Sequence, residues 1–152
     1  MDAIVCDTSS LIRLYKCQSL PLIAVGFVHV YIPAEVWDEC FPELRDALLK
    51  NGYLRMQPVP DIVAKHGKGE RAMLNLALER HIENVLTDDD KAISEARRRA
   101  LRALTTLDLL VLAKLLGAQV SIKHAVATMR EKNEGIDENK YQRALQDAGE
   151  SP

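Results

Sequence analysis

Short strand-like segments that alternate with helical stretches constrain the fold of this 152-residue chain more than any other feature of its sequence. These segments are residues 3–6, 28–32, 85–87 and 102–105. Parallel strands need a crossover connection, usually a helix, whereas antiparallel strands can be joined by a tight turn. The alternation therefore predicts an α/β fold in which helices cover both faces of a mostly parallel sheet.

The remaining sequence predicts the elements that lie between these strands. Residues 53–59 are predicted to form a further strand, and residues 61–69 a loop because of their Gly, Lys and His content. Ser121 and Asp137 are suitable N-caps for two final helices. Apolar spacing predicts four other helices, at residues 34–40, 43–50, 70–81 and 107–116. The aspartates at 88–90 are predicted to cap one more helix, which runs to about residue 101.

Composition limits the class of protein. Twenty Lys and Arg residues against 22 Asp and Glu residues give a formal net charge of −2, which excludes a polybasic nucleic-acid coat and an acidic disordered tail. A hydrophobic content of 47% is enough to fill the core of a chain of this length. We therefore expect a single domain over residues 1–152.

The cysteines and the N-terminus bear on the compartment. Cys6, Cys17 and Cys40 are an odd number and form no CxxC pair, which is typical of a reduced intracellular protein. No basic segment opens the chain, and the longest nearly apolar stretch, residues 107–116, is too short to cross a membrane. We expect a cytoplasmic protein that does not contact a membrane.

Acidic residues follow three of the predicted strands. Asp7 comes directly after the first strand, Asp88 after residues 85–87, and Asp108 just beyond the last strand. Ligands of open α/β sheets bind outside the carboxyl ends of the strands, so we expect these acids to converge on one edge. Glu39 and Glu70, on two of the predicted helices, are placed to join them.

Such a cluster of acids points to a metal site. Neighbouring carboxylates repel one another, and a hard divalent cation such as Mg²⁺ or Mn²⁺ removes the conflict. Such ions can activate water, orient a phosphodiester and neutralise the leaving oxygen. Each acid also has a simpler interpretation, since Asp88 is placed to cap a helix, and Glu39 and Glu70 taken alone are ordinary exposed helix residues. Only the joint pattern favours hydrolysis of phosphodiester bonds.

Four motifs resemble those of PIN-domain proteins, in particular the short prokaryotic branch related to VapC-type toxins. They are residues 4–12 (IVCDTSSLI), 32–39 (IPAEVWDE), 67–72 (GKGERA) and 85–89 (VLTDD). The resemblance covers a core of about residues 3–116, and the helices after residue 121 are similar to the C-terminal extension of that branch, here about residues 121–148. It implies a three-layer α/β/α sandwich and an endoribonuclease that depends on Mg²⁺ or Mn²⁺.

The resemblance also assigns roles to the acids. Position by position, Asp7, Glu39, Glu70 and Asp88 match the catalytic acids of the family. It implies that Asp7, Glu70 and Asp88 hold the metal, while Glu39 binds the same metal or positions the attacking water.

Other residues near these acids are further candidates. Asp89 competes with Asp88 for the same position in the motif, and Asp108 lies near a place where some members of the family have another acid. The hydroxyl groups of Thr8, Ser9 and Thr87 are predicted to orient the carboxylates that bind the metal.

Two groups of basic residues are candidates for contacts with RNA phosphates. Lys68 and Arg71 flank Glu70 and are predicted to bind substrate. Residues 91–102 are also net positive, but the exposed stripe of an amphipathic helix is the simpler interpretation of these charges.

Apolar segments predict a protein partner in addition to RNA. Residues 11–14 and 20–27 carry more apolar surface than one small domain easily covers, which predicts a homodimer or another protein interface. In the toxin branch that partner would be a small cognate antitoxin.

Two other functions were weighed against the ribonuclease. A phosphatase with Asp7 as its covalent nucleophile is disfavoured, because the second aspartate expected two residues later is Ser9. A non-catalytic PIN-like module that binds RNA or protein remains the main alternative. The presence of all four expected acids favours catalysis.

Overall fold

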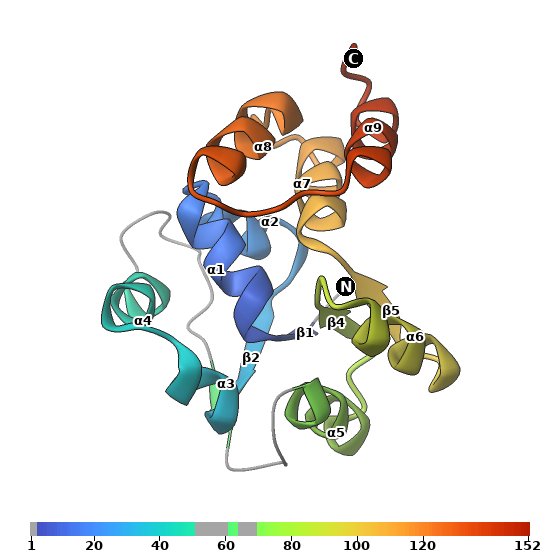
Figure 1. The fold of residues 1–152 in the computed structure, drawn as a ribbon. Helices are drawn as coiled ribbons and strands as arrows, with labels where there is room; N and C mark the ends of the chain where they lie inside the picture. Colours follow the sequence, from blue (N-terminus) through green and yellow to red (C-terminus); the bar gives the residue numbers. More distant parts are fainter. Residues whose placement is uncertain (1–2, 51–60, 64–69) are drawn as a thin grey trace.

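A five-stranded parallel sheet forms the centre of the computed structural model, which describes residues 3–50, 61–63 and 70–152 (Figure 1). The strand order is β3-β2-β1-β4-β5, and every neighbouring pair is parallel. The strands are β1 (Ala3–Cys6), β2 (His29–Pro33), β3 (Asp61–Val63), β4 (Asn84–Leu86) and β5 (Arg102–Leu104). The predicted α/β class and parallel sheet are confirmed.

Helices cover both faces of this sheet. They are α1 (Thr8–Lys16), α2 (Ile23–Gly26), α3 (Ala34–Glu39), α4 (Pro42–Leu49), α5 (Glu70–Arg80), α6 (Asp90–Arg98), α7 (Thr106–Leu115), α8 (Ile122–Glu131) and α9 (Glu138–Asp147), with a short 3₁₀ turn at Leu20–Leu22. The predicted N-caps of the last two helices are confirmed, since Ser121 and Asp137 each accept a backbone hydrogen bond in the first turn.

The alternation of side chains along β1 separates two hydrophobic cores. Ile4 and Cys6 point into a large core with α1, α4, α7 and α8, whereas Val5 points into a smaller core with α5 and α6. Successive residues of a strand face opposite sides of the sheet, so a fully apolar strand needs a helical layer on each side. The predicted α/β/α sandwich is therefore confirmed (Figure 1).

One loop prediction is wrong. Residues 61–63, which were assigned to a loop, form β3 and pair with β2 at the edge of the sheet. A strand of three residues is too short to show a periodic pattern, and the Gly and Lys residues that follow it obscured the signal. The strand predicted over residues 53–59 lies outside the described residues.

The apolar segments 11–14 and 20–27, which predict a partner interface, lie largely within the core of their own chain. Leu11, Leu14, Leu20, Ile23 and Phe27 are all buried in the large core. The segment after α1 folds back as the 3₁₀ turn and α2, and both pack against the strongly apolar α7. These residues therefore cover another element of their own chain, and the homodimer remains a prediction without this support.

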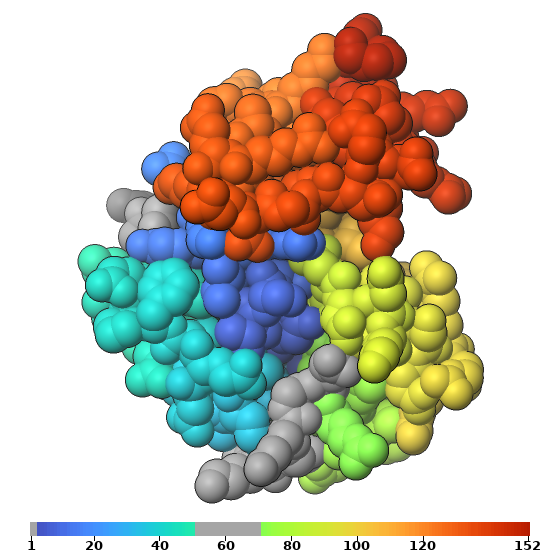
Figure 2. Space-filling view, viewed as in Figure 1, coloured from blue at the N-terminus to red at the C-terminus, as the bar shows by residue number. Residues whose placement is uncertain are grey.

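The two C-terminal helices pack on the same side as α1 and α7. Figure 2 shows residues of the C-terminal third, in orange and red, gathered at one end of the molecule above the blue α1. Helix α8 contacts α1 and α7, and α9 contacts α7 and α8. The division into a core of about residues 3–116 and an extension of about residues 121–148 remains a prediction. None of the described helices is long and apolar enough to span a membrane.

Glu150 ties the end of the chain to this bundle. Its carboxylate accepts hydrogen bonds from the backbone N–H groups of Ile122 (2.7 Å) and Lys123 (3.2 Å) at the start of α8 and from Lys114 Nζ (2.9 Å). Burial alone would raise the pKa of Glu150, but these three hydrogen bonds outweigh it and lower the pKa below its usual value. The charged form of Glu150 therefore stabilises the folded state.

We predict that Glu150→Ala lowers the free energy of unfolding by about 1–2 kcal/mol, because it removes hydrogen bonds between a charged group and unpaired helix N–H groups. Because the folded-state pKa is lowered, this stabilisation is present above the unfolded pKa and is lost as the pH falls through the folded one. Denaturant unfolding at several pH values measures the effect. Glu131→Ala, at the exposed end of α8, is the control, and equal losses in both variants would contradict the prediction.

Candidate active site

The register of β1 and β4 brings Asp7 and Asp88 to adjacent strand ends. Cys6 pairs with Leu86, and the Asp7 N–H donates to the Leu86 carbonyl (3.1 Å), so the ladder continues to the first aspartate. Thr87 N–H likewise donates to the Leu104 carbonyl of β5 (2.9 Å). Both acids therefore leave the sheet at its carboxyl edge, where the sequence predicted them.

Asp7 is a buried carboxylate that also begins α1. Its side chain is only 7% exposed, and Oδ1 accepts hydrogen bonds from Ser10 N–H (3.1 Å) and Ser9 Oγ (3.4 Å). Burial raises the pKa of Asp7, and the negative charge of Asp88 raises it further. Hydrogen bonds from the Thr87 side chain and from Ser10 oppose this rise without cancelling it. The two acids are thus close enough to repel each other.

Asp88 is held by donors from two helices. Its Oδ1 accepts a hydrogen bond from Thr106 N–H (2.9 Å) in α7. Its Oδ2 accepts from Thr106 Oγ1 (2.5 Å) and from Ser10 Oγ (3.0 Å) in α1. Arg13 Nη1 lies 3.3 Å from the same oxygen. This set of donors fixes the orientation of the carboxylate and compensates its charge.

The C-terminal extension positions Arg13. Arg13 Nε donates to Glu134 Oε1 (3.1 Å), and Nη2 donates to the Gly135 carbonyl (3.0 Å). Lys16 Nζ binds the other Glu134 oxygen at 2.7 Å. The loop between α8 and α9 therefore holds the guanidinium against Asp88, and the extension forms part of the site.

The sequence analysis missed Ser10, Arg13 and Thr106 as site residues. Ser10 belongs to the hydroxyl-rich run after Asp7, and Arg13 lies three residues later, on the same face of α1. Thr106 begins the helix that follows β5, at the same edge of the sheet as the two acids. The positions of Ser10 and Thr106, in the helix turns that follow β1 and β5, were a usable signal. The contacts of all three residues with Asp88 were not visible in the sequence.

The other acidic candidates are placed differently. Asp89 accepts from Ala92 N–H (3.3 Å) and caps α6, and Asp108 accepts from Thr105 N–H (2.9 Å) in a capping box of α7. Both carboxylates thus serve helix N-termini in this structure. Glu39 is exposed at the last residue of α3. The structure does not test whether these three acids bind a metal.

The remaining predicted residues have mixed positions. Ser9 contacts Asp7 as predicted, whereas Thr87 Oγ1 accepts a hydrogen bond from the Asp89 N–H (3.2 Å) in addition to its contact with Asp7. Thr8 lies in the first turn of α1, and Arg71 is exposed on α5. Glu70 begins α5, but its side chain lies outside the described residues, as does Lys68.

Asp7 and Asp88 suit a hard divalent cation. Mg²⁺ is usually bound through one or two carboxylates, with water and substrate oxygens completing its coordination. Burial and, to a smaller extent, the charge of Asp88 raise the pKa of Asp7, and a bound cation would offset both effects. Among the described residues no group of three or more His, Cys, Asp or Glu side chains could hold a metal. The fit to a metal thus depends on the chemistry of these two carboxylates.

We predict that Asp7→Asn stabilises the metal-free protein. Asparagine preserves the cap of α1 but removes a buried charge that Asp88 repels, so Tm should rise by about 2–4 °C near neutral pH, the shift that goes with about 1 kcal/mol in a chain of this size. Because the folded-state pKa is raised, Asp7 contributes most to the stability of the folded state at low pH, and this contribution is lost as the pH rises through the folded-state pKa. Thermal unfolding in EDTA checks the prediction, and a lower Tm for Asp7→Asn at neutral pH would refute it.

Comparison with known proteins identifies the family of the chain. No curated protein and no solved structure matches the chain. A family model described as a PIN domain matches residues 3–150, which includes all four motifs, both aspartates and the C-terminal helices. The chain therefore belongs to the PIN-domain family, whose members are generally nucleases.

Proposed function

We propose that this protein is an endoribonuclease that depends on Mg²⁺ or Mn²⁺ and hydrolyses phosphodiester bonds of RNA. The observation that carries the proposal is the pair of aspartates at adjacent strand ends, with Asp7 buried and Asp88 held by three side chains. A buried acid whose charge a neighbouring acid opposes is unfavourable for stability and is characteristic of functional sites. Family membership supports the nuclease chemistry, and the choice of RNA rests on the resemblance to the toxin branch.

Asp7 and Asp88 would hold the metal, with Glu70 as a further ligand. When bound, a divalent cation activates water, orients the phosphodiester and stabilises negative charge on the leaving oxygen. The chain itself keeps the two carboxylates in place. Ser9 and the Ser10 N–H bind Asp7, and Ser10 Oγ together with Thr106 binds Asp88.

Arg13 contributes a positive charge at the same carboxylate. Its guanidinium lies against Asp88 Oδ2 and is held there by Glu134 and Gly135. In the absence of a divalent cation, this contact offsets part of the negative charge of the site. Arg13 therefore competes with a metal for the oxygen that Asp88 offers.

The biological setting is a further part of the proposal. The resemblance to VapC-type proteins favours a toxin that is paired with a small cognate antitoxin, and it favours a homodimer in the cytoplasm. The alternative is a non-catalytic PIN-like module that binds RNA or protein.

Cleavage of end-labelled single-stranded RNA and transfer RNA tests the activity. We expect the purified protein to cut RNA with Mg²⁺ or Mn²⁺ and to stop in EDTA. Asp88→Asn should lower the rate at least about a hundredfold, because it removes a metal ligand while leaving a side chain of the same shape. Asp46→Asn, which makes the same change at an exposed residue of α4, is the matched control.

Each outcome separates the two functions. Cleavage that requires both the metal and Asp88 supports the ribonuclease and excludes a contaminating enzyme. Intact RNA in all reactions, together with no metal binding by calorimetry, would favour the non-catalytic module.

A second prediction concerns Arg13. We expect Arg13→Gln to bind Mn²⁺ several-fold more tightly than the wild type, because the competing cation at Asp88 is gone. Lys16→Gln is the matched control, since Lys16 also binds Glu134, while only Arg13 contacts Asp88. Calorimetric titration with Mn²⁺ measures both variants. Weaker Mn²⁺ binding by Arg13→Gln would instead mean that Arg13 is needed to hold Asp88 in place.

A further inference from the structure

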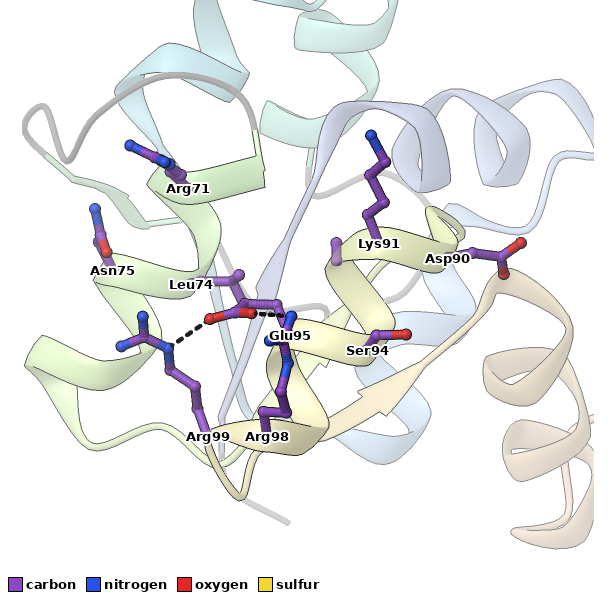
Figure 3. Close-up of a pocket in the computed structure, with 10 residues that line it drawn as sticks. Arg71, Leu74, Asn75, Asp90, Lys91, Ser94, Glu95, Arg98 and Arg99 are labelled. Carbon is purple, nitrogen blue, oxygen red and sulfur yellow. Dashed lines mark hydrogen bonds and ion pairs between the residues drawn. The ribbon is translucent and has the colours of Figure 1, made fainter.

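A cleft between α5 and α6 has no role in the site described above. Its volume is about 840 Å³, and it is open to solvent along both helices (Figure 3). The described residues that line it include four basic side chains and two acidic ones, namely Arg71, Lys91, Arg98, Arg99, Asp90 and Glu95. This described lining is net positive in a chain whose overall formal charge is −2.

Basic neighbours neutralise both acids in the cleft. Glu95 lies between Arg98 Nη2 (2.6 Å) and Arg99 Nε (3.0 Å), as the dashed lines in Figure 3 show. Hydrogen bonding from Arg99 and the charge of Arg98 lower the pKa of Glu95, so it remains an anion shared by two cations. Asp90 binds Lys140 of α9 (3.0 Å) and points away from the cleft.

Two cations in the cleft remain available to a ligand. Arg71 projects from the first turn of α5 and Lys91 from the first turn of α6 (Figure 3). Both are exposed, and neither forms an ion pair with another residue in the part of the chain that the structure describes. Arg71 acts on Glu95 only at longer range, where its charge helps to lower the pKa of that carboxyl, and no ion pair with a described residue has to break before either cation binds an anion.

The cleft begins beside the aspartates and leads away from them. Helix α6 starts two residues after Asp88, at the carboxyl edge of the sheet, so Lys91 lies at the end of the cleft nearest the site. Arg98 is seven residues further along α6, which corresponds to roughly 10 Å at a rise of about 1.5 Å per residue. An extended polyanion could thus contact basic groups along the whole cleft.

We propose that the α5–α6 cleft binds the phosphate backbone of the RNA strand next to the bond that is cut. This inference rests on the proposed ribonuclease function. Arg71 and Lys91 contact the phosphates nearest the aspartates, and Arg98 and Arg99 contact those further along the strand. The described residues that line the cleft are polar, charged or aliphatic, and its basic side chains bind phosphates, which carry no base sequence. We therefore expect contacts that do not depend on base sequence.

The cleft divides the basic residues of α6 into two groups. Lys91, Arg98 and Arg99 line it together with Arg71 of the neighbouring helix, whereas Arg97 lines a different depression beside α7 and α9. Arg102 lies exposed on β5 and does not line the cleft. An exposed stripe that serves only solubility would not account for cations from two helices meeting across one cleft.

The test is RNA binding measured without cleavage. Fluorescence anisotropy of a labelled oligouridine and a labelled oligoadenosine is followed with the wild-type protein in EDTA and with Asp88→Asn in Mg²⁺. The salt concentration is varied between about 50 and 200 mM, because each phosphate contact adds roughly −0.7 to the slope of log K against log salt for a single strand.

We expect Arg71→Ala/Lys91→Ala to weaken binding several-fold for both oligonucleotides and to reduce that slope by about 1.4, the value for two lost contacts. The control is Arg97→Ala/Arg102→Ala, which removes the same charge outside the cleft and should leave both quantities nearly unchanged. Thermal unfolding of each double variant establishes that it is folded.

Equal losses of RNA affinity in the two double variants would overturn the proposal, because the weaker binding would then come from the lower net charge of the protein. No loss in the cleft variant, or no RNA binding by the parent protein, would also overturn it and would favour an acidic protein segment as the ligand. The proposal for the cleft and the proposal of ribonuclease activity can be refuted separately. A protein that cuts RNA but binds it elsewhere refutes only the cleft, whereas one that binds RNA in the cleft without cutting it refutes only the activity.

Discussion

The structure depends on the parallel pairing of β1 with β4, because this pairing places two carboxylates side by side. Cys6 and Leu86 are partners in the ladder, so the residues that follow them leave the sheet at the same edge. Asp7 is buried and Asp88 nearly so, and burial together with the charge of Asp88 makes the charged form of Asp7 less favourable. Every donor around them can be understood as a response to this unfavourable pair.

These donors come from parts of the chain that lie far apart in sequence. Ser10 is 78 residues from Asp88, and Glu134 is 121 residues from the Arg13 that it orients. Thr106 contributes both its N–H and its hydroxyl from the start of α7. The apolar packing of α1 and α8 against α7 therefore does more than stabilise the fold. It sets the position of the groups that compensate the charge on Asp88.

Local signals in the sequence were enough to predict every strand of the described sheet except β3, the family, and the place of the two aspartates at the strand ends. An apolar run that ends in aspartate marks a strand end, and parallel topology then brings such ends together. The contacts of Ser10, Arg13 and Thr106 could not be predicted, because they depend on how the helices pack. What covers the apolar segment 20–27 could not be predicted for a related reason, since hydrophobicity shows that a surface is covered and leaves open whether its own chain covers it. Likewise, the sequence predicts a helix cap among the aspartates at 88–90 without choosing between them, and the structure assigns the cap of α6 to Asp89.

The arrangement of charge resolves a difficulty that any acidic nuclease site presents. RNA is a polyanion, and two neighbouring aspartates repel it unless cations intervene. Arg13 offsets the charge directly at Asp88, but a divalent cation must compete with it there, so it cannot also serve as a strong and permanent anchor for substrate. A separate run of cations that begins within a few residues of the site avoids this competition. The cleft between α5 and α6 has this property, because its acids are already paired with basic side chains and its two foremost cations are not paired within the described part of the chain. Binding of the strand and compensation of the acids can then be carried by different residues, and each can be altered without the other.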